Sequence, residues 1–352
     1  MGLLLHTLVK NLLIKISGFV FAERIGGKRY MCGMAEHVKD ERDLGYSWIF
    51  NVLGYVPKQR VVDIKTISIK DQGLTNTCVF QSATVQKEAD EGVPLSARFL
   101  VTQAKKKGRI TGNGFSSLRL GQQTLLEVGT CRQEMLTEDE QNWEAYSDPS
   151  KLSYCAELDA DQRKNKSFAQ VVTKDDWLHA LENNRIIHTG MPWRSSYNRN
   201  GGLTSPYILT LGKGIPLGGH AFVCTGFDLN KNLYKFQNSY SESYGDKGNF
   251  YVYINDWHRS GYVGYVSVDA DVLNPSAKFY EGKDVKSAND PKIYRIVEGK
   301  KRHFPDEATY FYFGGKFSPA SYTMIAGSLL RVFPEGPPMS KSDVKFIPDI
   351  GN

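Results

Sequence analysis

The spacing of apolar residues divides this chain into a helical first half and a strand-rich second half. In the first half, apolar side chains recur three and four positions apart, which is typical of helices buried on one face. Thr77 or Asn76 stands where the first helix begins, and Gly92 follows its end. The pattern predicts helices over residues 78–91, 97–108, 116–129 and 174–184.

The second half contains short runs rich in β-branched and aromatic residues. Residues 220–227 and 233–238 are two such runs, and the polar loop 228–232 joins them as a hairpin. A third run covers residues 250–254. Helices followed by an antiparallel sheet predict an α+β fold, with a cleft where the helical half meets the β half.

Two polar, glycine-containing stretches, residues 24–45 and 274–291, mark the expected boundaries. They predict three parts: an N-terminal extension (1–35), a main domain (36–280), and a small unit with an extended tail (281–352). In the last part, residues 292–304 form a predicted hairpin that turns at Glu298-Gly299. A unit this small is expected to dock on the main domain. Alternatively, the N-terminal helix and this unit dock on a partner protein or a surface.

Residues 1–22 have apolar side chains on one helical face, interrupted by Lys10 and Lys15. Three interpretations stay open for this segment: an amphipathic helix packed on protein, a cleaved signal peptide, or a helix lying on a membrane surface. No stretch of the sequence is apolar for the 18 or so residues that a transmembrane helix needs. The segment therefore fixes neither the compartment nor the processing of the protein.

The overall charge and the cysteines exclude several classes of site. The chain has 44 basic and 38 acidic residues, and the small excess is spread along it, so no nucleic-acid partner is expected. None of the five cysteines forms a C-x-x-C pair, so neither a metal site nor a cofactor is expected. Since five is an odd number, at least one thiol lies outside any intramolecular disulfide.

One cysteine stands where a reactive thiol would be placed. Cys78 opens the first predicted helix, and unpaired N–H groups there lower the pKa of a thiol. His220 begins a predicted strand directly after two glycines, so it has room to act as the base. Asn238 ends the next strand of the same hairpin, and its side-chain oxygen can accept the imidazole N–H that faces away from the thiol.

Gln72, six residues before the thiol, completes the expected machinery. Attack on an amide carbonyl produces an oxyanion, which needs hydrogen-bond donors already in place. The backbone N–H of Cys78 is one donor. The side-chain amide of Gln72, folded back by a turn at Gly73, is the expected second donor.

Three blocks of the sequence resemble papain-like cysteine peptidases of a microbial or viral type. "DQGLTNTC" is similar to the family's D-Q-G-x-C-G-S-C block, "GGHAFVCTGFD" to G-H-A-V-x-x-V-G-Y, and "FQNSYSESYGDKGNFYV" to K-N-S-W-G-x-x-W-G-x-x-G-Y. They occur in the family order, and His220 follows Cys78 by 142 residues, within the usual interval of about 130–150. The resemblance implies a papain-like fold with Cys78 as nucleophile, His220 as base, Asn238 as orienting residue and Gln72 as oxyanion donor.

The sequence departs from the family pattern at several positions. Thr75 replaces a disulfide cysteine, Val79 replaces the tryptophan after the nucleophile, and Tyr240 replaces the tryptophan that shields the Asn–His pair. About 35 residues precede the main domain without the helical pattern of a long inhibitory prosegment. Activation by removal of a prosegment is therefore not expected.

These features favour a cysteine endopeptidase that hydrolyses peptides or proteins through an acyl-enzyme. Two alternatives stay open. One is a papain-fold protein without catalysis, used as a structural or attachment part. The other is an amidase acting on an amide such as cell-wall peptide, since both reactions pass through the same intermediate.

Overall fold

The structure is a computed structural model. It describes residues 23–25, 28–35, 40, 43–50, 52, 54–110, 114–139, 142–198, 204–268, 280–287, 290–316, 318, 321–325, 330 and 333–343. The helix predicted over residues 1–22 lies outside these residues, so its three interpretations are not tested. No helix in the described ranges is both long and apolar enough to cross a bilayer.

Two compact units divide the chain. The first contains residues 1–38 and 53–267, and the second contains residues 39–52 and 268–352. Each is described by itself below. The boundaries drawn from the sequence, at residues 35 and 280, stay predictions.

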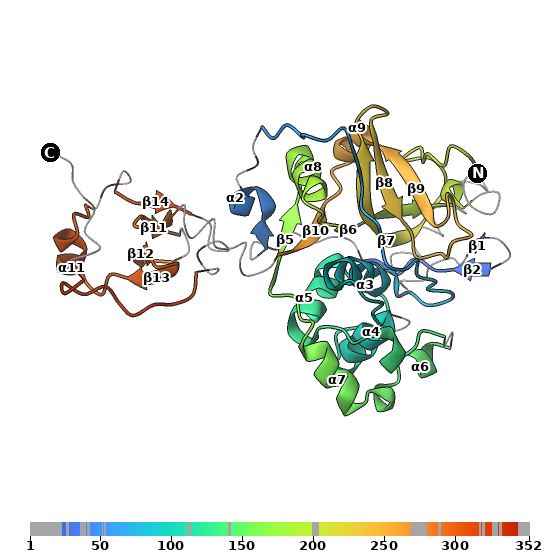
Figure 1. Cartoon of the computed structure of the whole chain (residues 1–352), viewed down its shortest axis with the longest axis horizontal. Coiled ribbons are helices and arrows are strands. Elements are labelled where there is room, and N and C mark those ends of the chain that lie inside the picture. Colours follow the sequence, from blue (N-terminus) through green and yellow to red (C-terminus); the bar gives the residue numbers. More distant parts are fainter. Residues whose placement is uncertain are drawn as a thin grey trace, which may run out of the picture. The chain divides into compact units, whose positions relative to one another are not determined.

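The helices between residues 78 and 161 gather on one side of the first unit (Figure 1). Helix α3 (Cys78–Glu91) packs against α4 (Ala97–Lys106) and α5 (Leu118–Val128). Their buried faces meet through Phe80, Leu100, Val101 and Leu125. Ser96 caps α4, because its side-chain oxygen accepts the Phe99 N–H at 3.1 Å. Shorter helices α6 (Trp143–Tyr146) and α7 (Tyr154–Asp161) follow.

Most helix predictions are confirmed. Helices α3, α4, α5 and α8 (Lys174–Glu182) occupy the four predicted ranges, and their ends differ from the prediction by a few residues at most. The cap of α3 differs from the prediction, because Thr77 occupies the cap position but its side chain makes no capping hydrogen bond.

An antiparallel hairpin forms the centre of the β half. Strand β7 (Pro216–Asp228) pairs with β8 (Leu233–Gln237), as predicted, and β8 pairs with β9 (Asn249–Tyr253). On the other side, β7 pairs with β6 (Ile187–Arg194), which the sequence analysis did not predict.

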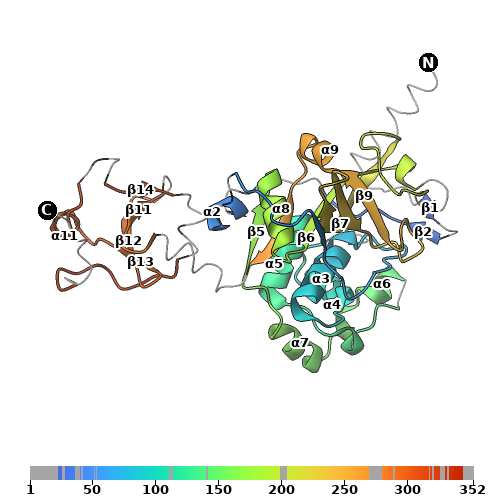
Figure 2. The ribbon, with the colours of Figure 1, turned by 45° about the horizontal axis from the view of Figure 1, so that its top comes forward.

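Further strands extend this sheet in the order β5-β10-β6-β7-β8-β9, all of which are labelled in Figure 1. Figure 2 shows β5, β6, β7 and β9 from a second direction. Strand β5 covers Ser167–Val171 and β10 covers Gly264–Val268, while β4 (Val61–Asp63) pairs with the far end of β7. Helix α9 (Ile254–Arg259) follows β9. The short hairpin of β1 (Glu23–Ile25) and β2 (Lys28–Tyr30) also belongs to this unit. The expected α+β fold is confirmed.

The second unit contains a small sheet of order β13-β12-β11-β14. Its strands are β11 (Asp284–Lys286), β12 (Ile293–Val297), β13 (Lys300–His303) and β14 (Thr323–Met324). The predicted turn between β12 and β13 is present, and Glu298 and Gly299 both have positive φ, 53° and 71°. Helix α11 (Glu307–Tyr312), strand β3 (Leu44–Gly45) and helix α2 (Tyr46–Phe50) also belong here.

Candidate active site

Cys78 is the first residue of α3, and α3 packs on β7. The Cys78 side chain is completely buried. Its sulfur accepts the backbone N–H of Gly33 at 3.4 Å. A residue from the N-terminal part of the chain therefore covers the thiol that the sequence marks as reactive.

His220 and Asn238 come together through the β7–β8 hairpin. Val223 of β7 pairs with Gln237 of β8, so Asn238 follows the end of β8 beside the start of β7. The His220 Nε2 and the Asn238 side-chain oxygen lie 2.7 Å apart. This is the contact that the hairpin prediction requires of an orienting asparagine.

Aromatic rings enclose this pair. Tyr240 stacks on His220 with ring centroids 4.4 Å apart and an interplanar angle of 26°. Trp193 of β6 meets the same imidazole edge-on at 4.7 Å. Tyr240 thus covers the face of the imidazole, and Trp193, which the sequence analysis missed, lies beside Tyr240 with ring centroids 5.8 Å apart and covers an adjacent side. Finding Trp193 would have required knowing that β6 pairs with β7.

The second nitrogen of His220 contacts tyrosine. The Tyr240 hydroxyl lies 3.3 Å from the His220 Nδ1. Among the hydrogen bonds of the described residues, none joins Cys78 to His220. The tyrosine that replaces the family's tryptophan thus brings a polar group to the imidazole nitrogen expected to serve the thiol.

Hydrogen bonds at both ends of the side-chain amide fix the orientation of Gln72. Its side-chain oxygen accepts the Ser239 hydroxyl at 2.7 Å. Its nitrogen donates to the backbone oxygens of Thr75 at 2.9 Å and Met31 at 2.7 Å. Ser239 therefore fixes which end of the amide is presented to Met31, a role that the sequence analysis did not assign.

Residues 31–35 run as an extended segment beside all of these groups. The Met34 N–H donates to the Gly219 oxygen at 2.9 Å, and the Ala35 N–H donates to the Ser116 oxygen at 2.6 Å. The Ser116 N–H in turn donates to the Gly33 oxygen at 2.8 Å. The segment is thus bonded on one edge to the residue before His220 and on the other to the residues that precede α5.

A cavity of about 510 Å³ lies next to this segment. Met34 lines it, together with Leu118, Met191, Pro192 and Val263. The apolar lining suits an unbranched or aliphatic side chain.

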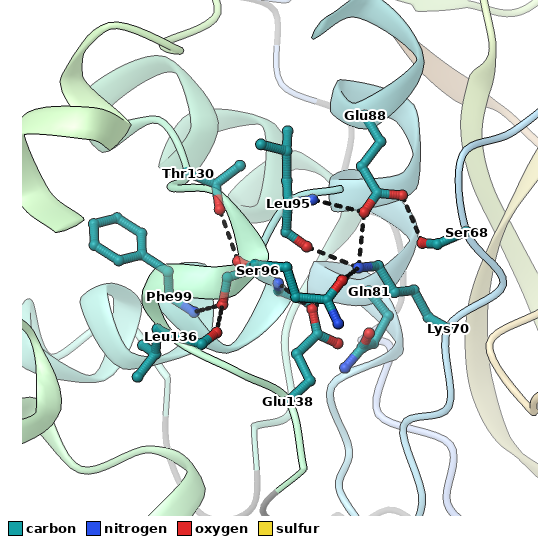
Figure 3. Close-up of polar contacts among 12 residues, drawn as sticks. Ser68, Lys70, Gln81, Glu88, Leu95, Ser96, Phe99, Thr130, Leu136 and Glu138 are labelled. Atoms are coloured by element: carbon teal, nitrogen blue, oxygen red, sulfur yellow. Dashed lines mark hydrogen bonds and ion pairs between the residues drawn. The ribbon is translucent and has the colours of Figure 1, made fainter. Parts of the chain in front are cut away.

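A buried ion pair fixes the turn that carries Gln72 (Figure 3). The Lys70 ammonium lies 2.8 Å from the Glu88 carboxylate of α3 and 3.1 Å from Glu138. It also donates to the Leu95 oxygen at 2.7 Å, and Glu88 accepts the Ser68 hydroxyl at 2.7 Å. The chain immediately after Lys70 is therefore anchored to the helix that begins with the thiol.

The ionisation of the two central groups differs from the expectation. Burial raises the pKa of Cys78 to about 11, although backbone N–H groups, those of Ala221 and Gly33 foremost, act to lower it. Burial also lowers the pKa of His220 to about 3, against the opposing effect of Asn238. The prediction that the helix start lowers the pKa of Cys78 is wrong for this structure, because the complete burial of the thiol outweighs the hydrogen bonds that would stabilise the thiolate. Both groups are neutral here at neutral pH.

A second histidine, His188 of β6, is completely buried and is linked to α3 through a glutamine of α5. Its Nδ1 lies 2.9 Å from the Gln122 side-chain nitrogen of α5, and Gln122 also donates to Gln86 of α3 at 2.8 Å. Gln86 in turn donates to the Ile186 and Tyr265 oxygens of the β half. These residues join the helical half to the β half.

We expect acid to destabilise this junction. Burial lowers the pKa of His188 from 6.5 to about 3, so below pH 6.5 the unfolded chain takes up a proton that the folded chain rejects. Stability is full above about pH 6.5 and falls as the pH drops toward 3. At pH 4 the loss is at most about 3 kcal/mol from this residue. Urea unfolding at pH 7 and pH 4 measures it, and His188→Gln, which cannot titrate, is expected to lose less by about that amount. An equal loss in both proteins would contradict the assignment to His188.

No group of three or more histidine, cysteine, aspartate or glutamate side chains suited to a metal occurs among the described residues. None of the five cysteines forms a disulfide.

Comparison with solved structures places the fold. The chain is similar to xylellain, a cysteine protease from Xylella fastidiosa, with a TM-score of 0.57 and 18% identity, over 71% of this chain and 98% of that one. It also matches digestive procathepsin L 3 of Tenebrio molitor larval midgut, with a TM-score of 0.49 and 12% identity, over 75% and 89% of the two chains. No protein-family model and no curated protein matches the sequence. The likeness to xylellain shows that this chain has a papain-like fold.

Proposed function

We propose that this papain-like protein is a cysteine peptidase that cleaves peptide bonds through Cys78. The observation that carries the proposal is the hydrogen bond of 2.7 Å between His220 and Asn238, with the Cys78 sulfur and the Gln72 amide both in contact with the neighbouring residues 31–33. The four residues come from separate parts of the sequence. A protein that used this fold without chemistry would have no need to bring them together.

The reaction follows from the roles of these groups. His220 takes the thiol proton, and the Cys78 sulfur attacks the carbonyl carbon of the substrate. The Gln72 amide and the Cys78 N–H donate to the oxyanion. His220 then gives the proton to the leaving amine, which departs and leaves a thioester. Water, deprotonated by His220, attacks the thioester, and the carboxylic acid is released as the thiol recovers its proton. Asn238 holds the imidazole throughout.

The test compares two cysteines of the same chain. Cys155 is exposed, whereas Cys78 is buried, so an unselective reagent labels Cys155 first. An epoxide-type peptidyl probe requires an activated thiolate, and we expect it to label Cys78 during prolonged incubation and to leave Cys155 unmodified. Mass spectrometry locates the label. His220→Ala is expected to abolish labelling of Cys78, and a peptide library is expected to be cleaved by the native chain but not by Cys78→Ala. Labelling of Cys155 alone would contradict the proposal.

One observation favours a second candidate, a papain-fold protein without catalysis. The His220 Nδ1 contacts the Tyr240 hydroxyl, and the Cys78 sulfur contacts the Gly33 N–H. A site that never reacts would show the same contacts. The same probe separates the two candidates, because a non-catalytic protein gives no selective label on Cys78.

The substrate class is a peptide or protein amide. The backbone groups of Ser116 and Gly219, which pair with residues 31–35, are suited to an extended peptide backbone. An amidase acting on cell-wall peptide uses the same acyl-enzyme. Cleavage of internal bonds in library peptides of ordinary L-residues distinguishes the endopeptidase from such an amidase.

We assign a binding or positioning role to residues 281–352, which contain none of the four proposed active-site residues. A chain ending near residue 280 is expected to keep selective labelling of Cys78 within about twofold, since the label depends on groups in the first unit. Circular dichroism checks that the shortened chain is folded. Loss of labelling in a folded chain would show that the C-terminal residues belong to the catalytic machinery.

A further inference from the structure

The Tyr240 hydroxyl lies at the nitrogen of His220 that is expected to serve the thiol. It is 3.3 Å from Nδ1, and the tyrosine ring stacks on the imidazole. The side chain is 1% exposed, and its ring contacts those of Trp193 and Tyr244 at centroid distances of 5.8 and 5.7 Å. The hydroxyl could leave the imidazole by a ring movement only if these contacts were broken.

The backbone of Tyr240 is fixed as well. Asp71 and Tyr240 form an antiparallel bridge. Beside this bridge, the Gln72 N–H donates to the Ser239 oxygen at 3.0 Å. The segment that positions the proposed oxyanion donor therefore also sets the position of the hydroxyl.

Asn238 determines which imidazole nitrogen carries the proton. Its side-chain oxygen accepts the Ser239 N–H at 2.7 Å, so this end of the amide is an acceptor. The same oxygen lies 2.7 Å from the His220 Nε2, which must then be the donor. A neutral imidazole has one protonated nitrogen, so Nδ1 has a lone pair. Tyr240 is consequently the donor in its contact with Nδ1.

The same lone pair is needed by the thiol. A cysteine reacts as its thiolate, and His220 produces the thiolate by accepting the Cys78 proton at Nδ1. One lone pair does not accept two well-directed hydrogen bonds, so the hydroxyl and the thiol are alternatives. The Cys32 sulfur lies 3.7 Å from the hydroxyl oxygen and is a second partner to which the O–H can turn.

Neighbouring charges do not decide between these alternatives. The other titratable side chains that act on Tyr240 are those of Cys32, Cys78 and Tyr244. Among the residues that the structure describes, no lysine, arginine or carboxylate acts on the pKa of His220. Burial raises the pKa of Tyr240 well above its usual value, so the hydroxyl keeps the proton that it donates.

We propose that Tyr240 is a positioning residue whose hydroxyl competes with the Cys78 thiol for the His220 Nδ1, and that it thereby limits how much of the Cys78–His220 pair is ionised. The proposal rests on the proposed function for its purpose, but the ionisation of the pair can be measured without any hydrolysis. Tryptophan, which the resemblance expects at this position, has no hydroxyl. The competition is therefore a property of this chain.

The first measurement is nitrogen-15 NMR of the histidine-labelled chain at pH 7. The spectrum of His220→Gln identifies the two resonances of His220. We expect Nε2 to be protonated and Nδ1 to be unprotonated. A protonated Nδ1 would overturn the proposal, because the hydroxyl could not then donate to it.

The second measurement compares the alkylation of Cys78 by iodoacetamide at pH 6 and pH 8, followed by mass spectrometry of the Cys78 peptide. The ratio of the two rates within one chain cancels differences in access to the buried sulfur. A thiolate paired with an imidazolium persists at pH 6, whereas an ordinary thiol is protonated there. Tyr240→Phe keeps the ring and loses the hydroxyl, and its ratio of the pH 6 rate to the pH 8 rate is expected to exceed the native ratio by about 2- to 10-fold, as for the loss of one neutral hydrogen bond.

Further variants make this comparison decisive. Tyr240→Trp also lacks the hydroxyl, so it is expected to raise the ratio and carries the test if circular dichroism shows that Tyr240→Phe is unfolded. Tyr234→Phe is the matched control, because it removes another hydroxyl that contacts a histidine, at 2.8 Å from the His258 Nε2, and its ratio is expected to equal the native one. The exposed Cys155 is the internal control for the reagent in every chain.

The outcomes separate this proposal from the proposed function. A raised ratio in Tyr240→Phe, without peptide cleavage by the native chain or the variant, would support the competition and contradict the peptidase. Peptide cleavage together with an unchanged or lowered ratio in folded Tyr240→Phe would overturn the competition and support the peptidase. An equal rise of the ratio in Tyr234→Phe would also overturn the competition.

Discussion

Gln72→Ala is expected to lower turnover of a peptide substrate by about 100- to 1000-fold, the usual cost of one oxyanion donor. The structure gives the reason, because the Gln72 nitrogen already donates to a backbone carbonyl oxygen, that of Met31, at 2.7 Å. The same amide can donate to the oxygen of a substrate once Met31 has left. Turnover of a fluorogenic peptide is compared between the native chain and Gln72→Ala.

Alkylation of Cys78 provides the contrast. Iodoacetamide reacts without forming a tetrahedral oxyanion, so Gln72→Ala is expected to leave that rate undiminished. Leu74→Ala, on the same turn and half exposed, is the matched control and is expected to change neither rate appreciably. If Gln72→Ala slowed alkylation and turnover equally, Gln72 would serve only to shape the turn.

Removal of Glu88 is expected to destabilise the fold by about 3–5 kcal/mol. Glu88 is completely buried and Lys70 is 4% exposed, so Glu88→Ala leaves an ammonium with only Glu138 as a charged partner. It also leaves the Leu95 N–H and the Ser68 hydroxyl without their acceptor. Urea unfolding at neutral pH measures the change in the free energy of unfolding.

Glu144→Ala is the matched control for this prediction. Glu144 pairs with Lys105 but is 80% exposed, so its loss is expected to cost less than about 1 kcal/mol.

The loss of Glu88 is also expected to disturb the residues of the candidate active site. The Lys70 oxygen accepts the Ser241 N–H at 3.0 Å, and the neighbouring Asp71 pairs with Tyr240. A change below about 1 kcal/mol in Glu88→Ala would show that Glu138 alone satisfies Lys70.

The elements that the sequence revealed are those with local signals. Helix α4 begins at a serine that caps it, and the β7–β8 hairpin has a polar loop between two apolar runs. Asn238 could be placed beside His220 because hairpin geometry alone brings the two positions together. Strand β6 has no such signal, since it contains Gly190 and Pro192 and pairs only through distant partners.

The same limit explains what was missed at the site. Ser239 and Trp193 act through residues far away in the sequence, 167 positions in the case of the Ser239 contact with Gln72. Residues 31–35 carry no pattern of helix or strand, and their position depends on hydrogen bonds with Ser116 and Gly219, which no rule of spacing connects to them. The raised pKa of Cys78 follows from its burial among residues of both halves, so it too could not be anticipated.

The separations along the chain also set an order of assembly. His220 and Asn238 are 18 residues apart on one hairpin, a closure that takes microseconds in isolated peptides. Cys78 lies more than a hundred residues before both of them, and contacts between distant segments form late because loop closure precedes any gain. During refolding, the imidazole and its asparagine are therefore expected to pair while the thiol is still accessible to solvent. For that interval the cysteine lacks the complete burial that it has in the folded chain, which makes the refolding chain more vulnerable to oxidation than the folded one.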